Sequence, residues 1–246
     1  SQLPAEQLRI GEMTLQLDYP ESIPDWTFRG SLQADKQQLT SRIKLFRNNE
    51  DLGWADMEVR ADNHFHLRLL KHDSPFIIID GALSFTDKLQ LESTQLFNLS
   101  DTQHWLNQLL SSNEVTSQIP LIKAGSISLT GQTTFPLKTQ LSPDNLLRSL
   151  QTEQSFSGNI QLDKPLPSIG TLTSEIEGSL KFQEHKLKTT LNRSSLFNLD
   201  HIQIKGLNSP INRVQINLTS PLQINIDTGN LLSASHLPVM IQPISA

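Results

Sequence analysis

Hydrophobic and polar residues alternate along most of the chain. Leu67 and Leu69 flank Arg68, and Ile160 and Leu162 repeat the pattern further on. Successive side chains of a β-strand point to opposite faces, so a period of two predicts strands with one aliphatic and one polar face. We expect roughly 14 to 17 such strands, each of about five to eight residues.

The alternation changes phase once near the start of the chain. Leu8 and Ile10 are out of phase with Met13 and Leu15, and the change falls at Gly11. An extra residue in one strand of an antiparallel pair shifts the phase in this way. We therefore expect a bulge or a bend at Gly11.

Two alternating runs near the end of the chain, Val214–Leu218 and Leu222–Ile226, are separated by Thr219, Ser220 and Pro221. Short polar segments that contain Pro commonly connect neighbouring antiparallel strands. The pattern therefore predicts a hairpin formed by these two runs.

One segment, Phe76–Ile79, is apolar without alternation. A strand of this kind is buried on both faces, so we expect a central strand that lies under a helix. Two segments have apolar residues at helical spacing. The first begins at Ser100 and Asp101 and contains Trp105, Leu106, Leu109 and Leu110; the second begins at Ser142, Pro143 and Asp144 and contains Leu146, Leu147 and Leu150. Ser at the N-cap, with Pro or Asp following it, is a typical start signal for a helix.

The chain contains similar segments. Gly81–Phe85 is followed by Leu96–Leu99, and Gly178–Phe182 is followed by Leu196–Leu199. Both pairs contain Gly-x-Leu-x-Phe and then Leu-Phe-Asn-Leu, although the distance from Gly to Leu is 15 residues in the first and 18 in the second. We predict a single elongated β domain over residues 1–246, with a candidate internal repeat at about 26–150 and 151–246.

The amino-acid composition argues against several classes of protein. Lys and Arg number 20 against 25 Asp and Glu, and no basic cluster is present, which argues against nucleic-acid binding. Cysteine is absent, so neither disulfides nor Cys-based zinc sites are available. No apolar run is long enough for a transmembrane helix. The chain begins at Ser1 and Gln2 without a Met, and we expect a mature or excised segment of a longer protein.

Candidate chemistry is sparse. Asp62, His64 and His66 share one face of a predicted strand and could ligate a divalent metal, but a solvated outer face is the favoured interpretation, so we expect no metal. Acidic pairs such as Glu175 and Glu177 are read as surface carboxylates. Nucleophile-elbow, Walker and Gly-x-Gly-x-x-Gly motifs are all missing. We therefore expect no enzyme and no cofactor, and a hydrolase of envelope sugars remains only a minor alternative.

The aliphatic strand faces need a partner. A second sheet would make a closed β-sandwich, whereas an open curved sheet could hold the hydrocarbon chains of a ligand. Periodicity alone leaves both alternatives open. The lining would be almost purely aliphatic and aromatic residues are only 6%, which suits acyl chains better than stacked sugars or bases.

The repeated Gly-x-Leu-x-Phe strands, Leu96–Leu99, the polar outer faces and the absence of Cys resemble the AsmA-like superfamily, with YdbH-type and TamB-type envelope proteins closest. The resemblance is one of pattern and extends over most of residues 8–241. It implies a long, curved β-sheet with a hydrophobic inner groove. Together with the two helical segments, the expected fold is mostly β: an elongated, twisted antiparallel sheet with an apolar concave face and two short helices packed on it. The resemblance also implies a place in the periplasm of Gram-negative bacteria, with an inner-membrane anchor outside this segment, and a passive role in lipid transport between the two membranes.

On this basis we expect a groove that shields the acyl chains of a phospholipid or a similar ligand. An envelope protein could also pair with a sheet edge. The alternative is a structural or adhesive envelope or secretion-system module without lipid. The candidate groove lining, taken from the alternation, is Leu15, Leu17, Leu67, Leu69, Ile127, Leu129, Ile160, Leu162, Ile202, Ile204, Val214, Ile216, Leu222 and Ile224.

Overall fold

The computed structural model describes residues 7–17, 26–109, 120–136, 149–203, 206, 209–227 and 239–243. Strands make up 78% of these residues and form one large antiparallel sheet that is not closed into a barrel. One helix, α1 (Leu99–Leu109), accompanies the sheet. The mostly β fold expected from the alternation is therefore confirmed.

The sheet has fifteen strands. Their bounds are β1 (Gln7–Leu17), β2 (Trp26–Asp35), β3 (Gln38–Arg47), β4 (Glu50–Arg60), β5 (His64–Lys71), β6 (Ser74–Phe85), β7 (Lys88–Asn98), β8 (Ile122–Pro136), β9 (Gln151–Leu166), β10 (Ile169–Gln183), β11 (Lys186–Leu191), β12 (Leu196–Ile202), β13 (Ile211–Asn217), β14 (Leu222–Asp227) and β15 (Val239–Pro243). From β1 to β11 each strand pairs with the next one in the chain.

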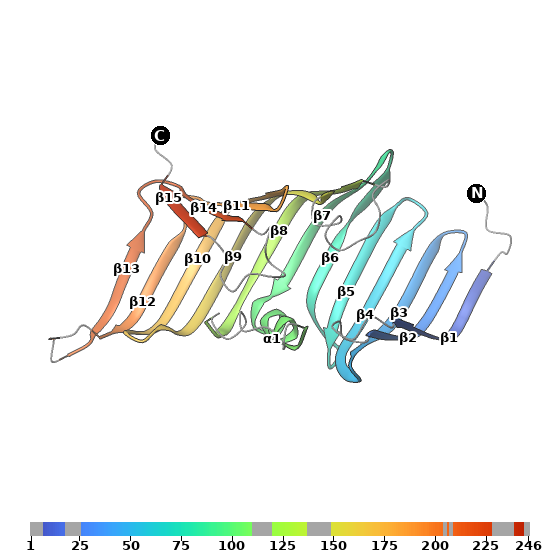
Figure 1. Ribbon diagram of the computed structural model, residues 1–246, viewed down its shortest axis with the longest axis horizontal. Coiled ribbons are helices and arrows are strands. Elements are labelled where there is room, and N and C mark those ends of the chain that lie inside the picture. Colours follow the sequence, from blue (N-terminus) through green and yellow to red (C-terminus); the bar gives the residue numbers. More distant parts are fainter. Residues whose placement is uncertain are drawn as a thin grey trace.

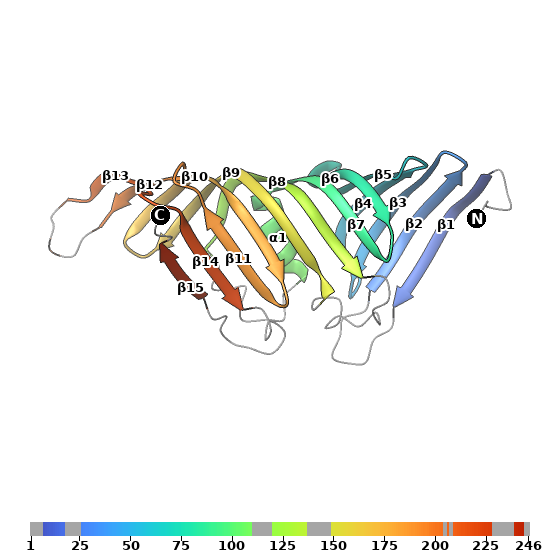
Figure 2. The same cartoon turned by 90° about the horizontal axis from the view of Figure 1, so that it is seen from above.

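Figures 1 and 2 show the strands side by side along the long axis of the molecule, with β1 at one end and β13 and β15 at the other. The long strands bend along their length, so the sheet is curved.

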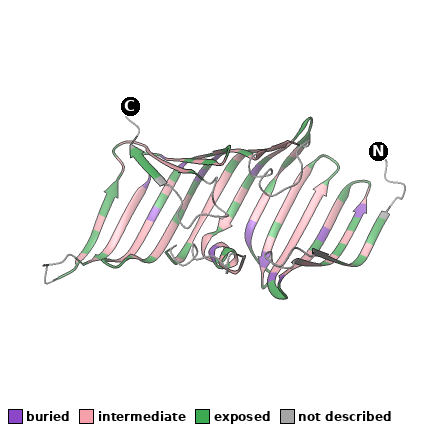
Figure 3. Cartoon of the chain, in the orientation of Figure 1, coloured by how far each residue is buried: buried purple, intermediate pink, exposed green. Residues whose placement is uncertain are grey.

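Few side chains are fully buried. Among the described residues the buried hydrophobic side chains are Ala34, Leu52, Leu70, Phe76, Ile77, Phe156 and Leu191. Intermediate exposure dominates the strands (Figure 3). The described strands form one sheet, not the two facing sheets that a sandwich requires.

The sheet forks at β10. The first part of this strand, Ile169–Glu175, pairs with β12, and the last part, Gly178–Gln183, pairs with β11. Strands β11, β14 and β15 form an upper arm, and β12 and β13 form a lower arm. No strand of one arm pairs with a strand of the other among the described residues, and the arms diverge in Figure 2.

The fork falls where the two similar segments differ in length. In the first, β7 is one continuous strand that pairs with β6 from Phe85 to Ile77. In the second, the corresponding stretch is divided into β11 and β12 by Asn192–Ser195. Four residues there occupy the place of Thr94 and Gln95 in β7, so two of the three additional residues lie at the break.

Helix α1 lies at the ends of several strands. Trp105 contacts Phe76 of β6, with ring centroids 5.9 Å apart, and its indole Nε1 donates a hydrogen bond to the Leu52 carbonyl at 3.1 Å. The predicted central strand next to a helix is thus present, and Phe76 and Ile77 are its buried residues. Within the described part of the chain, no helix has the length and apolar character needed to cross a bilayer.

Two further predictions can be compared with the structure. The irregularity near Gly11 is confirmed, because the register of β1 against β2 shifts between Ile10 and Met13. The hairpin of Val214–Leu218 with Leu222–Ile226 is wrong: β13 pairs with β12, whereas β14 pairs with β11 and β15. The segment between them crosses from one arm to the other. Of the second predicted helix, residues 142–148 lie outside the described residues.

Glycines also lie in the middle of strands. A Cβ at Gly81 would fall on the Glu92 carbonyl oxygen of β7, and a Cβ at Gly178 would fall on the Thr190 carbonyl oxygen of β11. Neighbouring strands therefore approach these positions too closely for any side chain. The two glycines are required by the sheet itself, not by a turn.

Candidate functional site

Strand register brings aliphatic side chains into rows that cross the sheet. Leu69 pairs with Ile77, Ile77 with Phe97, and Phe97 with Ile127. Paired residues of neighbouring strands point to the same face, so these four side chains lie side by side over β5–β8. The alternation predicts the aliphatic face of each strand separately, and the register joins these faces into a continuous row.

The next strands continue the pattern. Leu129 pairs with Phe156, and Leu162 pairs with Leu172. Ile160 lies two residues from Leu162 on the same strand and therefore on the same face. Gly158 stands opposite Ile127, so the row formed by Leu69 and Ile127 ends there in a position without a side chain.

The fork divides the remaining candidates between the two arms. Leu222 pairs with Leu191 in the upper arm, with Ile224 on the same face. In the lower arm the paired residues are Val214 with Leu199, and Ile216 with Phe197. These lining candidates are half-buried apart from Ile216, which is 43% exposed.

The remaining predicted lining residues are Leu15, Leu17, Ile202 and Ile204. Leu15 and Leu17 belong to β1 and pair with Phe28 and Trp26, but their side chains lie outside the described residues, as does all of Ile204. Ile202 follows His201, whose φ of 57° interrupts the strand alternation. Its register partners are Ile169 and Ile211.

Polar residues interrupt the aliphatic rows on the same face, and the sequence analysis did not single them out. Thr152 and Gln154 are in phase with Phe156 on β9, and Thr133 is in phase with Leu129 on β8. Ser93 and Gln154 are only 4% and 3% exposed. The signal was available: polar residues stand at in-phase positions of otherwise aliphatic strands.

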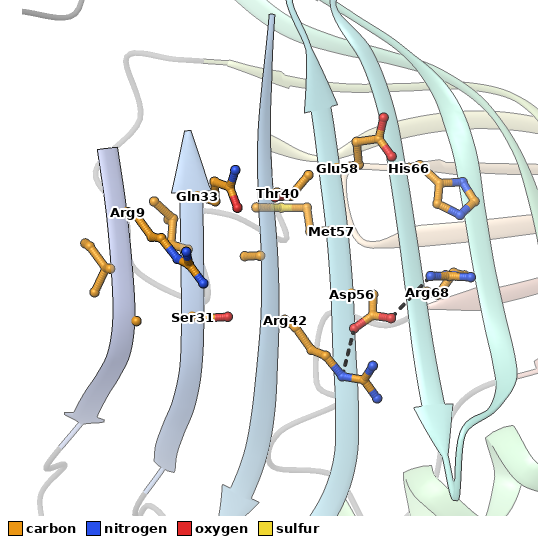
Figure 4. Close-up of a pocket in the computed structure, with 14 residues that line it drawn as sticks. Arg9, Ser31, Gln33, Thr40, Arg42, Asp56, Met57, Glu58, His66 and Arg68 are labelled. Carbon is orange, nitrogen blue, oxygen red and sulfur yellow. Dashed lines mark hydrogen bonds and ion pairs between the residues drawn. The ribbon is translucent and has the colours of Figure 1, made fainter. Parts of the chain in front are cut away.

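The opposite face carries charged side chains at the N-terminal end of the sheet. A hollow of about 400 Å³ lies there between β1 and β5. Figure 4 shows its lining side chains, which include Arg9, Arg42, Asp56 and Arg68. Asp56 lies between two guanidinium groups, 3.6 Å from Arg42 Nε and 3.3 Å from Arg68. Because Asp56 carries the opposite charge, it offsets part of the positive charge of the two guanidinium groups.

The ion pairs continue into a set of stacked cations and rings. Arg42 lies 4.9 Å from the centre of the Trp54 ring and also pairs with Asp73 at 3.0 Å. Lys44 lies between Trp54 and Phe46, at 5.6 and 5.4 Å from the two ring centres. Both cations, Arg42 and Lys44, therefore already interact with partners within the protein.

The two histidines of the candidate metal site lie on this charged face. His66 Nδ1 is 2.9 Å from Asp80 Oδ2, and His64 Nε2 is 3.4 Å from the same oxygen. The hydrogen bond from His66, with both imidazoles nearby, lowers the pKa of Asp80. Among the described residues no group of three or more His, Asp or Glu has a geometry that could hold a metal ion. Asp62 does not join the histidines as a ligand; its carboxylate accepts a hydrogen bond from the His64 backbone N–H at 3.1 Å.

Comparison with known proteins does not assign the chain to a family. No family model, no curated protein and no solved structure matches it.

Proposed function

We propose that the chain is a segment of a periplasmic envelope protein that shields phospholipid acyl chains in a hydrophobic β-groove during transport between membranes. The observation that carries the proposal is the set of aliphatic rows on one side of an open sheet. Leu69, Ile77, Phe97 and Ile127 are register neighbours in one such row, and three of them are half-buried.

The partial exposure of the aliphatic side chains supports the same proposal. A sheet with an aliphatic face gains most of its stability when that face is removed from water, at about 25 cal/mol per Å². Here Ile77 is buried, but Leu69, Phe97 and Ile127 in the same row are only partly covered. An acyl chain laid along the rows would cover them, and each CH2 would contribute about 0.8 kcal/mol.

The function proposed is passive. The aliphatic residues supply no proton transfer, and a chain held only by apolar contacts can move along the rows without breaking hydrogen bonds. The curvature in Figures 1 and 2 suits this role, since a curved sheet that does not close into a barrel could leave one side of a ligand free for a hydrated head group. Periplasmic location is part of the proposal and rests on the resemblance to AsmA-like envelope proteins.

The alternative is a structural or adhesive module that binds a protein by strand addition. The outer edges of β1, β13 and β15 favour it, because no described strand pairs with them. The two functions make different demands on the aliphatic rows: lipid shielding requires contact between the rows and a hydrocarbon chain, whereas strand addition requires only the edges.

A photo-crosslinking experiment separates these functions. The crosslinking amino acid p-benzoylphenylalanine is placed at Leu129, in an aliphatic row, or at Ser128, its neighbour on the other face of β8. Cells of a Gram-negative host express each protein in the periplasm, and covalent adducts are identified by mass spectrometry after irradiation. We expect lipid adducts at Leu129 and few at Ser128.

Equal labelling at the two positions, or no lipid adduct at either, would contradict the proposal. A second measurement extracts the wild-type protein with organic solvent and identifies any lipid that accompanies it. Absence of lipid in both measurements, with a protein adduct at an edge residue such as Met240, would favour the adhesive module.

A further inference from the structure

One hydrogen-bond acceptor among the aliphatic rows lacks a partner. The Gln154 side chain on β9 is 3% exposed, and its Oε1 is buried without any hydrogen bond. Burying an amide oxygen away from water without a new hydrogen-bond partner lowers the stability of the fold by about 1–3 kcal/mol. Such an atom calls for a physical explanation.

The surrounding hydroxyl groups fix the orientation of this amide. Thr152 Oγ1 donates to the Gln132 carbonyl at 3.2 Å, and Thr133 and Thr152 lie 2.9 Å apart. Each hydroxyl has one proton, so Thr152 has none left and Thr133 must donate to Thr152. Both oxygens can then only accept, and they accept from Gln154 Nε2 at 3.3 and 3.1 Å. Rotating the amide would lose both bonds, so Oε1 must point the other way.

Oε1 points towards a row of small residues. Gly81 pairs with Ser93, Ser93 with Gly131, and Gly131 with Gln154, across β6–β9. A Cβ at Gly131 would lie 3.1 Å from Gln154 Oε1, so the amide oxygen lies beside the position that a side chain at Gly131 would take. Because Gly131 has no side chain, no Cβ covers the amide oxygen from this side.

We propose that Gln154 Oε1 and the small-residue row of Gly81, Ser93 and Gly131 form a binding site for a hydrogen-bond donor carried by an acyl-chain ligand. This inference rests on the proposed function, because the site lies within the aliphatic rows. The oxygen can only accept, so the ligand must bring an O–H or N–H group close to its hydrocarbon chain. Hydroxylated and amide-linked acyl chains have that group.

The same chemistry disfavours a plain diacyl phospholipid at this position. Its acyl esters carry acceptors and no donor, so an ester beside Oε1 would leave both oxygens without a partner. Such a lipid would pass Gln154 with its hydrocarbon only, whereas a hydroxyacyl chain would be held in one register. The site therefore selects among acyl-chain ligands.

The test compares two single-chain probes, 3-hydroxymyristate and myristate, by isothermal titration calorimetry with the whole chain. We expect the hydroxylated probe to bind about two- to tenfold more tightly, the ratio that one hydrogen bond supplies. Gln154→Met keeps the length of the side chain and removes the acceptor, and should abolish the preference while leaving myristate binding in place. The control, Gln132→Met, changes an exposed glutamine on the other face of β8 and should keep the preference.

The outcomes distinguish this inference from the proposed function. Equal binding of the two probes to the wild type overturns the inference and leaves the groove intact, as does a preference that survives Gln154→Met. If neither probe binds the wild type, the proposed function fails and the inference fails with it. The wild-type comparison decides the matter even if Gln154→Met does not fold.

Discussion

The Ser195 hydroxyl takes the place of a missing strand partner for Glu177. Its Oγ accepts a hydrogen bond from the Glu177 N–H at 3.1 Å and donates one to the Glu177 carbonyl at 3.2 Å. The same carbonyl accepts the Asn192 N–H at 2.7 Å. Glu177 lies between the part of β10 that pairs with β11 and the part that pairs with β12. One buried side chain thus satisfies the backbone where the sheet divides.

Replacing Ser195 by Ala should destabilise the protein. Ser195 is 2% exposed, and its loss would leave the Glu177 N–H buried without an acceptor, which costs about 1–3 kcal/mol. Urea unfolding measures the change, and hydrogen exchange at Glu177 should quicken. The control is Ser194→Ala, which removes an exposed bond to the Glu177 carboxylate and should change the unfolding free energy by less than about 0.5 kcal/mol. Equal effects of the two substitutions would show that Ser195 has no special role at the fork.

Gly81→Ala should disturb the pairing of β6 with β7. The new Cβ would fall on the Glu92 carbonyl oxygen, and the strands would have to separate to admit it. Forced overpacking of this kind costs about 1–3 kcal/mol or more. Thermal unfolding followed by circular dichroism measures the effect. Gly11→Ala provides the comparison, because nothing lies within 4 Å of a Cβ there, and its melting temperature should stay close to that of the wild type.

Trp105 should anchor helix α1 through both packing and a hydrogen bond. Trp105→Ala removes the contact with Phe76 and the bond to the Leu52 carbonyl, and should cost about 3 kcal/mol or more. Trp105→Phe keeps an aromatic ring and loses the N–H donor, so its cost should be smaller. Chemical denaturation of the two variants gives the difference, and a phenylalanine variant as unstable as the alanine variant would contradict the assigned packing role.

Asp80 should make stability depend on pH in the acidic range. The hydrogen bond from His66 lowers its pKa below the ordinary value of 3.8. A carboxyl group whose pKa is lower in the folded protein stabilises it above the unfolded pKa. This contribution is lost as the pH falls from about 3.8 through the lower pKa of the folded state.

Denaturation of the wild type and of Asp80→Asn across this range tests the dependence. The wild type should be the more stable at neutral pH, and the difference should shrink below about pH 4. Asp163→Asn serves as a control, because Asp163 is exposed and its carboxylate forms no hydrogen bond or ion pair with the described residues. A difference between wild type and Asp80→Asn that stays constant with pH would assign the effect of Asp80 to something other than its charge.

Alternation predicted most strands because it reports a local property. Leu67 and Leu69 must share a face of any strand that contains them, whatever the partner strand. The change of phase at Gly11 and the presence of helix α1 (Leu99–Leu109) likewise depend on residues that are close together in the chain. Phe76–Ile79 was also informative, because a run without a polar face needs cover on both sides, and Trp105 supplies part of it.

The hairpin prediction failed because alternation does not say which strands pair. Val214–Leu218 and Leu222–Ile226 are close in sequence, and their patterns would match in a hairpin. Each run has another neighbour with aliphatic residues in register: Leu199 and Phe197 for β13, and Leu191 and Leu187 for β14. The break at Asn192–Ser195 decides between these pairings, since it places β11 and β12 on the same edge of β10.

The sequence analysis did not predict the cluster of polar side chains around Gln154, again because alternation does not say which strands pair. Thr133, Thr152 and Gln154 lie on two strands, and each looks like an ordinary polar residue in a chain rich in Ser, Thr, Asn and Gln. Only the register shows that they meet, with Gln154 Nε2 bonded to both threonines. The in-phase position of Gln154 relative to Phe156 was the one available signal.

The sequence by itself determined the strand faces, the bulge near Gly11 and one helix, because each depends on contacts between residues close in the chain. The tertiary structure alone decided that the strands form one open sheet, that this sheet divides at Glu177 and Ser195, and that Gly81, Ser93, Gly131 and Gln154 stand in one row. These features depend on register between strands, and register is set by hydrogen bonds between segments that no local pattern can pair uniquely.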